Sequence, residues 1–498
     1  MSIDHVEVRS GAYADSVTLM RVSRRVGRLE GVGAALVAMA SELNLELLAG
    51  MGFAPPRHAG INDLLVAIRA QDEDALQAAL ATTAEALTAR PAASASAGDV
   101  PAPRTVGAAS RSVGGGALVL LSLPGQYVFA EAVDAVESGR DVMVFSDNMP
   151  LAQEVRLKEI AAEHGRLVMG PDCGTAVVRG TGLGFANAVD PGPVGIVAAS
   201  GTGAQQVLTL LDAAGVGVSA LLGVGGRDLS TAVAGRSTVT ALDALDADPD
   251  TELIMVVSKP PAAEIAAAVR AHAATLRTPV QFALLGRGRP DLTAAVEAAL
   301  NALGRAVPRW PSWGTGDTPA ARPGALRGLY TGGTLCDEAM VIASEALGAI
   351  RSNIPLEPEW ALPDSLRAPG HLMIDFGDDA LTVGRPHPMI DPSQRLARIA
   401  DEAVDPECGV LLLDVVLGHA AHDDPAAELA PAVRAGRETA RARGAELPVV
   451  ISLVGSERDP QGTSRQAETL RDAGAEVFAS NAQAVRHAVS LLTPGGTR

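Results

Sequence analysis

The chain has 498 residues, of which 47% are hydrophobic, 20% charged and 3% aromatic, and its net charge is −18. This length suffices for roughly three or four domains of about 100–200 residues each, and the hydrophobic content excludes a disordered polymer. Because the acidic charge repels phosphodiester backbones, nucleic acid is not an expected partner.

The three cysteines, Cys173, Cys336 and Cys408, lie far apart in the sequence. They form neither a disulfide framework nor a zinc-binding pattern, and this usage is typical of a reducing compartment. The amino-terminal segment MSIDHVEVRSG lacks the apolar core of a signal peptide, and no charge-free apolar stretch reaches about 18 residues. We therefore expect a soluble cytoplasmic protein with no membrane partner and no metal centre.

Residues 1–92 predict a small α+β domain. Its expected strands are HVEVRSGAY, VGAALVAM and DLLVAIRA, and its expected helices are DSVTLMRVSRRVGRL and DEDALQAALATTAEALTAR. The first helix is amphipathic, and the second begins with acidic residues that favour the positive end of the helix dipole. Residues 93–115 are rich in Ala, Pro and Ser without periodicity, which is typical of a linker.

Residues 116–190 alternate strands and helices in a pattern that predicts a Rossmann-like domain. The strands ALVLLSLPG, DVMVFSDN and RLVMGPDCGT are largely apolar, which indicates a parallel, doubly wound sheet. Ligands of such sheets bind at the carboxyl ends of the strands. The candidate residues at these ends are Ser122, Gly125, Ser146 and Asn148 for a cofactor, and Asp172 and Cys173 for a substrate.

Residues 191–306 and 326–498 predict two further α/β units, joined by a Pro- and Gly-rich linker at 307–325. The expected strands are VGIVAAS, VSALLGVGG, LIMVVSK and VQFALLG in the first unit, and LRGLYTGG, HLMIDFGDD, GVLLLDVVLG, LPVVISLVG and AEVFAS in the second. Both units alternate strand, polar turn and helix. The chain is therefore expected to be an α/β protein with a small amino-terminal α+β domain.

The segment GPVGIVAASGTGAQQV, residues 192–207, runs from a buried strand through Ser200, Gly201, Thr202 and Gly203 into a helix. Such a turn leaves backbone N–H groups free at the positive end of the helix dipole, so it suits a phosphate or another anion. Capping of the helix by Ser or Thr explains the same residues without a ligand. The turn is neither a P-loop nor a GxGxxG fingerprint.

Positively charged side chains follow two other expected strands of residues 191–306. The turn GVGGRD contains Gly225 and Gly226, which allow close backbone approach, and Arg227, whose guanidinium suits a carboxylate or a phosphate. A salt bridge from Arg227 to the next residue, Asp228, is the alternative. Lys259 follows the strand LIMVVS, where a solvated loop lysine is the alternative to a ligand contact.

Cysteine and histidine provide further candidates. Cys173 lies in a tight turn with no histidine placed beside it by the sequence, so a small structural residue is the alternative to a nucleophile. In GRPHPMIDP, Arg385 and His387 lie in a loop bracketed by prolines, where a solvated histidine is the alternative. In LGHAAHDDP, His419 and His422 are three residues apart, but no further ligand is fixed, so a zinc site is not predicted.

Several ordered blocks carry a resemblance to known families. GPDCGT, GFANA, GIVAASGTGAQQV and GVGGRDLS resemble the succinyl-CoA synthetase α-subunit, and GVLLLDVVLGHAAHDD with LPVVISLVGSERDPQG is similar to the carboxyl-terminal domain of its β-subunit. Over nearly its full length the chain resembles the FdrA family, through FSDN, LVMGPDCGT, ASGTG, GGRDLS, VSKPP, GLYTGGTL, IDFGDD, TVGRPHPMIDP, LLLDVV and the ERDPQ region. The resemblance implies a CoA-binding-type Rossmann domain and two flavodoxin-like ligase domains.

In the synthetases, two helix N-termini, one from each ligase domain, hold a phosphate on a histidine. By position, the corresponding helices of this chain would start after Ser200, Gly201 and Thr202 and near Gly418 and His419. The segment matching the synthetase histidine is GRGRPDLTAAVEAAL, residues 286–300, which holds no histidine, and no ATP-grasp domain is recognisable. Nucleotide-driven CoA ligation by this chain alone is therefore not expected.

The resemblance to the FdrA family implies a subunit of an oxamate carbamoyltransferase, which converts oxalurate and phosphate to oxamate and carbamoyl phosphate in purine and allantoin catabolism. Two alternatives stay open: an NDP-forming acyl-CoA synthetase that needs a separate ATP-grasp partner, and a non-catalytic scaffold subunit. The expected partners are a small carbamoyl or acyl substrate and sibling enzyme subunits, and a homo-oligomer also fits. Phosphate is the expected substrate, and CoA stays open as a cofactor.

The resemblance also suggests roles for the candidate residues. Phosphate and substrate binding is expected from Ser200, Gly201, Thr202, Gly203, Gly225, Gly226, Asp172, Cys173 and Lys259. Arg227 and Arg385 are candidates for the substrate carboxylate or for charge that develops in the reaction. His387 or His419 is the candidate for proton transfer.

Overall fold

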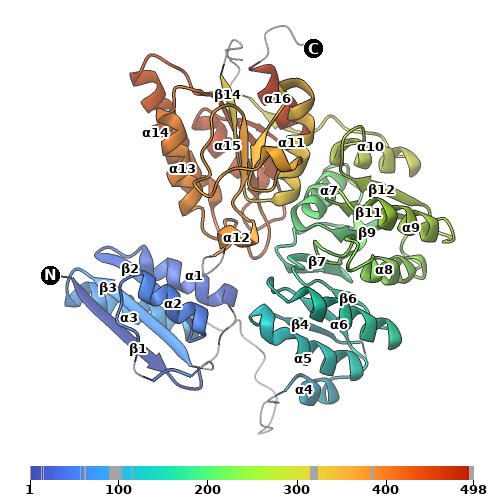
Figure 1. Cartoon of the computed structure of the whole chain (residues 1–498), viewed down its shortest axis with the longest axis horizontal. Coiled ribbons are helices and arrows are strands. Elements are labelled where there is room, and N and C mark those ends of the chain that lie inside the picture. Colours follow the sequence, from blue (N-terminus) through green and yellow to red (C-terminus); the bar gives the residue numbers. More distant parts are fainter. Residues whose placement is uncertain are drawn as a thin grey trace. The chain divides into compact units, whose positions relative to one another are not determined.

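The computed structural model divides the chain into two compact units, residues 1–104 with 382–386 and residues 105–381 with 387–498 (Figure 1). The structure describes residues 2–12, 14, 16–56, 58–60, 63–88, 103, 105–114, 116–314, 324–382 and 386–492. None of the helices in this described part is both long and apolar enough to cross a membrane.

The first unit is a three-stranded antiparallel sheet with helices on both faces, which confirms the expected α+β domain. Its central strand β3 buries Val66 and Ile68 against helices α1 and α3, and buries Leu65 and Ala67 against α2, because alternate side chains point to opposite faces. The sequence did not predict α2. The elements are β1 (Ile3–Arg9), α1 (Ser16–Gly27), β2 (Val32–Met39), α2 (Glu42–Gly50), β3 (Leu64–Ala70) and α3 (Glu73–Thr88), in the sheet order β1-β3-β2.

The second unit begins with a three-stranded parallel sheet in the order β4-β5-β6. Each strand lies next to the one before it in the sequence, so the sheet never reverses its winding direction. The elements are α4 (Val106–Ser112), β4 (Leu118–Leu121), α5 (Gly125–Glu137), β5 (Asp141–Val144), α6 (Leu151–Glu163) and β6 (Val168–Met169).

A six-stranded sheet follows, in the order β12-β11-β9-β10-β7-β8. Residues 175–184 were expected in the Rossmann-like segment, but they form the β7–β8 hairpin, which pairs antiparallel with β10. The elements are β7 (Thr175–Val178), β8 (Thr181–Gly184), β9 (Pro191–Ala199), α7 (Gly201–Ala213), β10 (Val218–Gly223), α8 (Arg236–Asp246), β11 (Leu253–Ser258), α9 (Ala263–Ala273), β12 (Val280–Leu284) and α10 (Leu292–Ala302).

The last sheet has seven strands, in the order β13-β19-β18-β17-β14-β16-β15. Strand β13 lies inside the predicted linker 307–325 and pairs antiparallel with β19. The elements are β13 (Ser312–Trp313), β14 (Ala325–Tyr330), α11 (Gly333–Leu347), β15 (Arg351–Ser352), a 3₁₀ turn η1 (Pro358–Trp360), β16 (Leu372–Asp375), α12 (Asp379–Thr382), α13 (Ser393–Val404), β17 (Cys408–Val416), α14 (Pro425–Ala442), β18 (Val449–Val454), α15 (Thr463–Asp472), β19 (Glu476–Phe478) and α16 (Asn481–Ser490).

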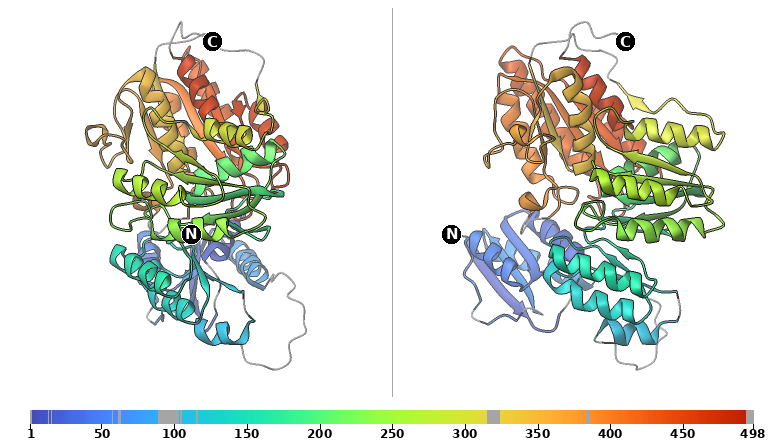
Figure 2. Two further views of the ribbon diagram at one scale, coloured as in Figure 1. Left: turned by 90° about the vertical axis from the view of Figure 1, so that its right-hand side faces the viewer. Right: turned by 45° about the vertical axis from the view of Figure 1, so that its right-hand side comes forward.

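The six-stranded and seven-stranded sheets are joined through their helices. Helices α7 and α10 of the former pack against α11 and α16 of the latter, while α13, α14 and α15 cover the other face of the seven-stranded sheet (Figures 1 and 2). Strands β9, β11, β14 and β17 are almost wholly buried because helices cover both faces, which is why their sequences are continuous apolar runs. This packing brings α7 and α11 together.

Candidate functional site at a helix junction

Both larger sheets reverse their winding direction at one point. In the six-stranded sheet, the connection from β9 leads to β10 on one side and that from β11 to β12 on the other, and Ser200 and Lys259 directly follow β9 and β11. In the seven-stranded sheet, β14 leads to β15 and then to β16 on one side, β17 leads to β18 on the other, and Thr331 follows β14. Ligands of open parallel sheets bind at such reversals. The topology therefore marks these strand ends as the candidate site.

The N-termini of α7 and α11 touch each other. Ser200 Oγ accepts the N–H of Gly203 at 3.0 Å and donates to Thr334 Oγ1 at 2.7 Å. A Cβ on Gly203 would lie 2.7 Å from Thr334 Cγ2, and a Cβ on Gly332 would lie 2.6–2.7 Å from the Thr202 side chain. Only glycine fits at these two positions, and we call this contact the helix junction.

The helix junction concentrates positive potential. The first N–H groups of an α-helix have no acceptor within the helix, and the helix dipole places its positive end there. For Gly201, Thr202, Gly333 and Thr334, no acceptor of the backbone N–H occurs among the described residues. Two such ends side by side suit a phosphate or a carboxylate.

A buried ion pair holds the start of α11 in place. The carboxylate of Asp414, on β17, accepts the N–H and the hydroxyl of Thr331 at 2.8 and 3.0 Å and the N–H of Gly332 at 3.0 Å. Arg395 donates to the same carboxylate at 2.7 Å. Burial raises the pKa of Asp414, while Arg395 opposes the shift. The ion pair fixes the turn at Thr331 and Gly332, which precedes α11.

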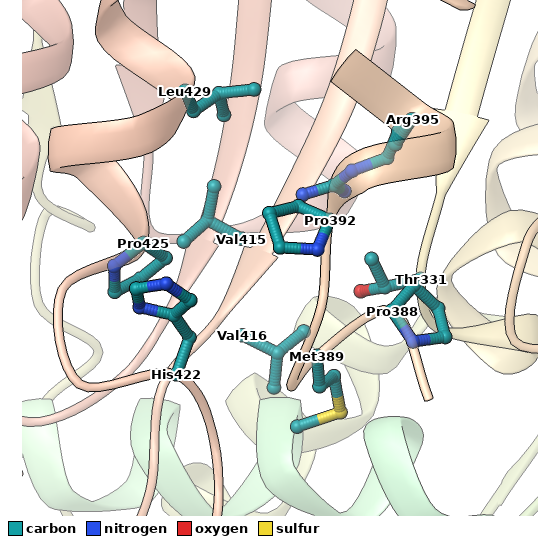
Figure 3. A pocket seen from close by; sticks show the side chains of 10 residues that line it. All are labelled: Thr331, Pro388, Met389, Pro392, Arg395, Val415, Val416, His422, Pro425 and Leu429. Carbon is teal, nitrogen blue, oxygen red and sulfur yellow. The ribbon is translucent and has the colours of Figure 1, made fainter. Parts of the chain in front are cut away.

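Next to this ion pair lies a cavity of about 20 Å³, room for roughly one water molecule. Figure 3 shows the side chain of Arg395 extending into the ring of residues around it, and Arg395 Nε has no acceptor among the described residues. His422, in the same ring, pairs with Glu428 at 2.7 Å and accepts the N–H of Asp424. The cavity is therefore too small to hold a substrate.

Lys259 and Asp375 converge on the first residue of α11. A Cβ on Gly333 would lie 2.8 Å from Lys259 Nζ and 2.6 Å from Asp375 Oδ2. Burial disfavours the charge of Lys259, but the carboxylates of Asp337 and Asp375 outweigh it and raise the pKa of the ammonium. No carboxylate lies within 4 Å of Nζ in the described part of the chain. The Lys259 ammonium therefore lies near the helix junction and forms no ion pair with a carboxylate of the described residues.

His387 lies beside Asp375. Its Nδ1 accepts the N–H of Met389 at 3.2 Å, so the neutral ring carries its proton on Nε2. A Cβ on Gly377 would lie 2.8 Å from His387 Nε2 and 3.2 Å from Asp375 Oδ1. Burial lowers the pKa of His387 to about 4, so the imidazole stays neutral at neutral pH and acts as a hydrogen-bond donor.

The candidates of the GVGGRD turn contact neighbouring groups of the protein. Arg227 donates to the Met149 carbonyl at 2.8 Å and pairs with Glu154 at 2.9 Å, not with Asp228. Gly225 has φ +90°, and its Cβ would lie 2.4 Å from the carbonyl oxygen of Pro171. Gly226 faces Asp172, with 3.4 Å between the Cβ position and Oδ2. The turn therefore packs closely onto the GPDCGT turn.

Asp172 and Cys173 differ in their surroundings. The Asp172 side chain is exposed, yet the protein around it desolvates the carboxylate and, together with Asp379, raises its pKa to about 7 against the opposing charge of Lys259. Cys173 is 2% exposed, and burial raises the pKa of its thiol to about 12. Asp172 thus lies within electrostatic reach of Lys259, whereas Cys173 is a buried thiol that stays protonated at neutral pH.

His419 lies away from the helix junction. It lines a separate pocket of about 140 Å³, volume for a few water molecules, together with Asn187 and Arg458. The second phosphate-binding helix was expected near Gly418, but the helix after β17 begins only at Pro425, and α11 is the helix that meets α7. The expected position was wrong because β14, not β17, runs directly into a helix. Arg385 lies outside the described residues.

Four residues of the site were not expected from the sequence: Thr334, Asp337, Asp375 and Asp414. A signal for the first was present, because Thr331–Thr334 follows a buried strand and starts a helix just as Ser200–Gly203 does. A lone aspartate within the apolar run LLLDVV was the signal for Asp414. Asp337 and Asp375 acquire their significance only from the proximity of Lys259.

Comparison with known proteins gives two family matches. Residues 1–103 match the model described as "AllF, heavy metal-associated domain", and residues 329–491 match the model described as "CoA-ligase". The uncharacterized protein YahF of Escherichia coli (strain K12) is 36% identical over 498 residues, covering 96% of each chain.

More distant relatives match parts of the chain. The ADP-forming succinate–CoA ligase subunit alpha-2 of Trichomonas vaginalis is 28% identical over 145 residues, covering 28% of this chain and 46% of that subunit. Among solved structures, the dinucleotide-forming acetyl-coenzyme A synthetase 1 of Ca. Korarchaeum cryptofilum matches with 17% identity and a TM-score of 0.28, covering 75% of this chain and 82% of that one.

The residues present do not fit a heavy-metal site in the amino-terminal domain. Residues 1–103 contain no cysteine. Among the described residues, no group of three or more His, Cys, Asp or Glu side chains could hold a metal ion. The soft thiolate ligands that select such metals are therefore missing from this domain.

CoA binding is suggested by the relation to CoA ligases, but the expected cofactor turn does not fit it. A Cβ on Gly125 would lie 2.1–2.5 Å from backbone atoms of residues 147–149, so this glycine accommodates a neighbouring loop and not a diphosphate. The carbonyl of Ser146 accepts the N–H of Asp172 at 2.9 Å, and Asn148 adopts a φ of +55° within that loop. The sheet β4-β5-β6 also has no reversal at which a ligand crevice would open.

Proposed function

Because this chain belongs to the family of YahF, which is related to the CoA ligases, we propose that it is a subunit of a phosphate-dependent carbamoyltransferase of the oxamate carbamoyltransferase type. The proposed reaction converts oxalurate and phosphate to oxamate and carbamoyl phosphate. The AllF-type amino-terminal domain and the resemblance to the FdrA family support a place in allantoin nitrogen catabolism.

One observation carries the proposal: the Ser200–Thr334 contact, which aligns two helix N-termini beside Lys259, a lysine with no carboxylate within 4 Å among the described residues. Free N–H groups and Lys259 can together hold a phosphate in a fixed orientation. The synthetases use such a junction for a phosphohistidine, but in this chain Arg287 follows β12 and pairs with Glu357 and Trp360. The site therefore suits inorganic phosphate as the reacting group.

The chemistry follows from this arrangement. Phosphate bound at the helix junction attacks the carbamoyl carbon of oxalurate, and negative charge develops on the carbamoyl oxygen. Backbone N–H groups, Lys259 and the Nε2–H of His387 are positioned to stabilise that charge. Catalysis then consists mainly of positioning and electrostatic stabilisation, and no step requires CoA or a nucleotide.

The experiment is a product assay of the purified chain, alone and combined with its sibling subunits. Oxalurate and phosphate are supplied, and carbamoyl phosphate is followed by ³¹P nuclear magnetic resonance. We expect carbamoyl phosphate in amounts that depend on phosphate and are unaffected by CoA. Acyl-CoA formation that requires CoA and a nucleotide would favour the synthetase alternative, and binding of neither phosphate nor CoA would favour a scaffold.

A further inference from the structure

We propose that Asp375 is the acid–base residue of the transfer, giving a proton to the leaving nitrogen and taking one back from phosphate. This inference rests on the proposed function and adds a residue that the sequence did not single out. The substrate class is an N-carbamoyl amide that carries a carboxylate.

The proton balance of the step closes without a further reactant. An oxygen of hydrogen phosphate forms a bond to the carbamoyl carbon, and the carbon–nitrogen bond then breaks with its electron pair moving to nitrogen. The nitrogen takes the proton of the Asp375 carboxyl group and leaves as a primary amide. The hydroxyl proton of the phosphate passes to the Asp375 carboxylate, which restores the residue.

The two oxygens of Asp375 have different environments. Oδ1 accepts the N–H of Gly377 at 2.9 Å, and the backbone of Asp375 is held on both sides by Asn353, at 3.0 and 2.9 Å. Oδ2 faces Gly333 at the start of α11 and has no hydrogen-bond donor among the described residues, although the side chain is only 3% exposed. A fixed carboxyl group with one free oxygen at the anion site is what proton transfer requires.

The charges around Asp375 support a proton that is exchangeable near neutral pH. Burial raises the pKa of Asp375 to about 7, Lys259 opposes this shift, and Asp378 and Asp414 add to it. A general acid is most effective when its pKa lies near the working pH. Cys336, on α11, lies within electrostatic reach of the carboxylate, and burial raises its pKa well above the usual range, so it stays a neutral thiol.

The neighbouring groups are less suited to the role. His387 has its pKa lowered to about 4, so at neutral pH its Nε2–H belongs to a neutral ring and is not released. The pKa of Lys259 is raised, which keeps it a cation. The pKa of Asp337 is raised to about 6, but this residue is the fifth of α11, whereas Asp375 Oδ2 lies against the first residue of that helix.

The test compares Asp375→Asn with the wild type in the full enzyme complex. Asparagine keeps the oxygen that accepts the Gly377 N–H but carries no titratable proton. We expect kcat to fall about 100-fold or more, as is typical for loss of general acid–base catalysis, while KM for phosphate changes less than threefold. A wild-type kcat in this variant would overturn the proposal.

A pH profile provides a readout that a merely structural role would not move. At saturating phosphate, wild-type kcat should be constant below the pKa of about 7 and fall above it, because only the protonated carboxyl group donates. Asp375→Asn should lack this fall, and Asp375→Glu should retain it at reduced kcat. A wild-type profile without a descending limb near pH 7 would contradict the proposal irrespective of how the variants fold.

Asp212→Asn is the matched control. Asp212 lies on α7 and its pKa is raised to about 6, but it binds Arg458 at 2.6 Å, on the domain contact away from the helix junction. Its replacement should leave kcat and the pH profile unchanged. Failure of the wild type to form carbamoyl phosphate would refute the proposed function itself, whereas an active wild type with an equally active Asp375→Asn variant would refute only the role of Asp375.

Discussion

The parallel sheet β4-β5-β6 and the two larger sheets use the same strand–turn–helix pattern. Their turns differ in whether space for a ligand remains beside the glycine at the start of the helix. A Cβ on Gly125, at the start of α5, would meet backbone atoms of a neighbouring loop at 2.1–2.5 Å. A Cβ on Gly201, at the start of α7, would meet nothing within 4 Å. A glycine turn before a helix is therefore an anion site only where the topology keeps its N–H groups accessible.

The two lysines of the chain extend this comparison. Lys158, on α6, is almost fully buried and binds Glu154 at 3.0 Å and Asp228 at 2.8 Å. Lys259 has no such partner within 4 Å among the described residues and faces the helix junction. Lys158 joins helix α6 to the loop after β10, and Lys259 is available to a ligand.

The largest effect is expected from exchanging these lysines for methionine. Lys259→Met should lower carbamoyl transfer about 100-fold or more, because it removes the cation that stabilises the phosphate and the developing charge. Lys158→Met should instead destabilise the fold by about 3–5 kcal/mol, since it removes the buried cation that the Glu154 and Asp228 carboxylates share. Enzyme kinetics measure the activity of both variants, and denaturant unfolding measures their stability. Equal losses of activity in two folded variants would contradict the different roles of the two lysines.

The second-largest effect is expected at Gly125, where the backbone of a neighbouring loop fills the turn before α5. Gly125→Ala should destabilise the protein by about 3 kcal/mol or more, because its methyl group would overlap the backbone of residues 147–149. Gly114→Ala, in the same domain, is the control, since a Cβ there meets nothing within 4 Å. Thermal unfolding is the measurement. A fully stable Gly125→Ala variant with altered CoA affinity would instead identify this turn as an open cofactor site.

A smaller effect is expected at the helix junction itself. Gly203→Ala should separate the two helix ends, because its methyl group would lie 2.4 Å from Ser200 Oγ and 2.7 Å from Thr334 Cγ2. We expect a loss of stability of about 1–3 kcal/mol and weaker phosphate binding in calorimetry. Gly201→Ala, two residues earlier, should bind phosphate like the wild type. Equal behaviour of the two variants would mean that the helix contact does not shape the anion site.

The smallest effect is expected at Cys173. Because burial raises the pKa of its thiol to about 12, the thiolate is scarce at pH 8 and shielded from solvent. Ellman's reagent should therefore leave Cys173 unmodified in the folded protein and modify it after unfolding in guanidinium chloride. Peptide mass spectrometry identifies the labelled residue, and rapid labelling in the native state would restore the nucleophile hypothesis.

Much of the fold could be predicted from the sequence, because period-two and period-3.6 patterns and turn residues are local. The buried strands before Ser200, Lys259 and Thr331 were all expected, as was the α+β domain. The sheet to which residues 175–184 belong was not expected. A hairpin that follows β6 can pair with the sheet β4-β5-β6 or with the six-stranded sheet, and it pairs with the latter. Strand pairing is decided by packing over long sequence separations.

The sequence by itself determined the elements and the anion turn at Ser200–Gly203, because a helix cap requires only neighbouring residues. The tertiary structure alone decided which second helix meets that turn, and it selected α11 and not a helix near Gly418. It also decided that Lys259 and Asp375, 116 positions apart, converge on Gly333, and that His387 stays neutral beside them. The physical reason is that desolvation and proximity of charges arise only when separate sheets pack together.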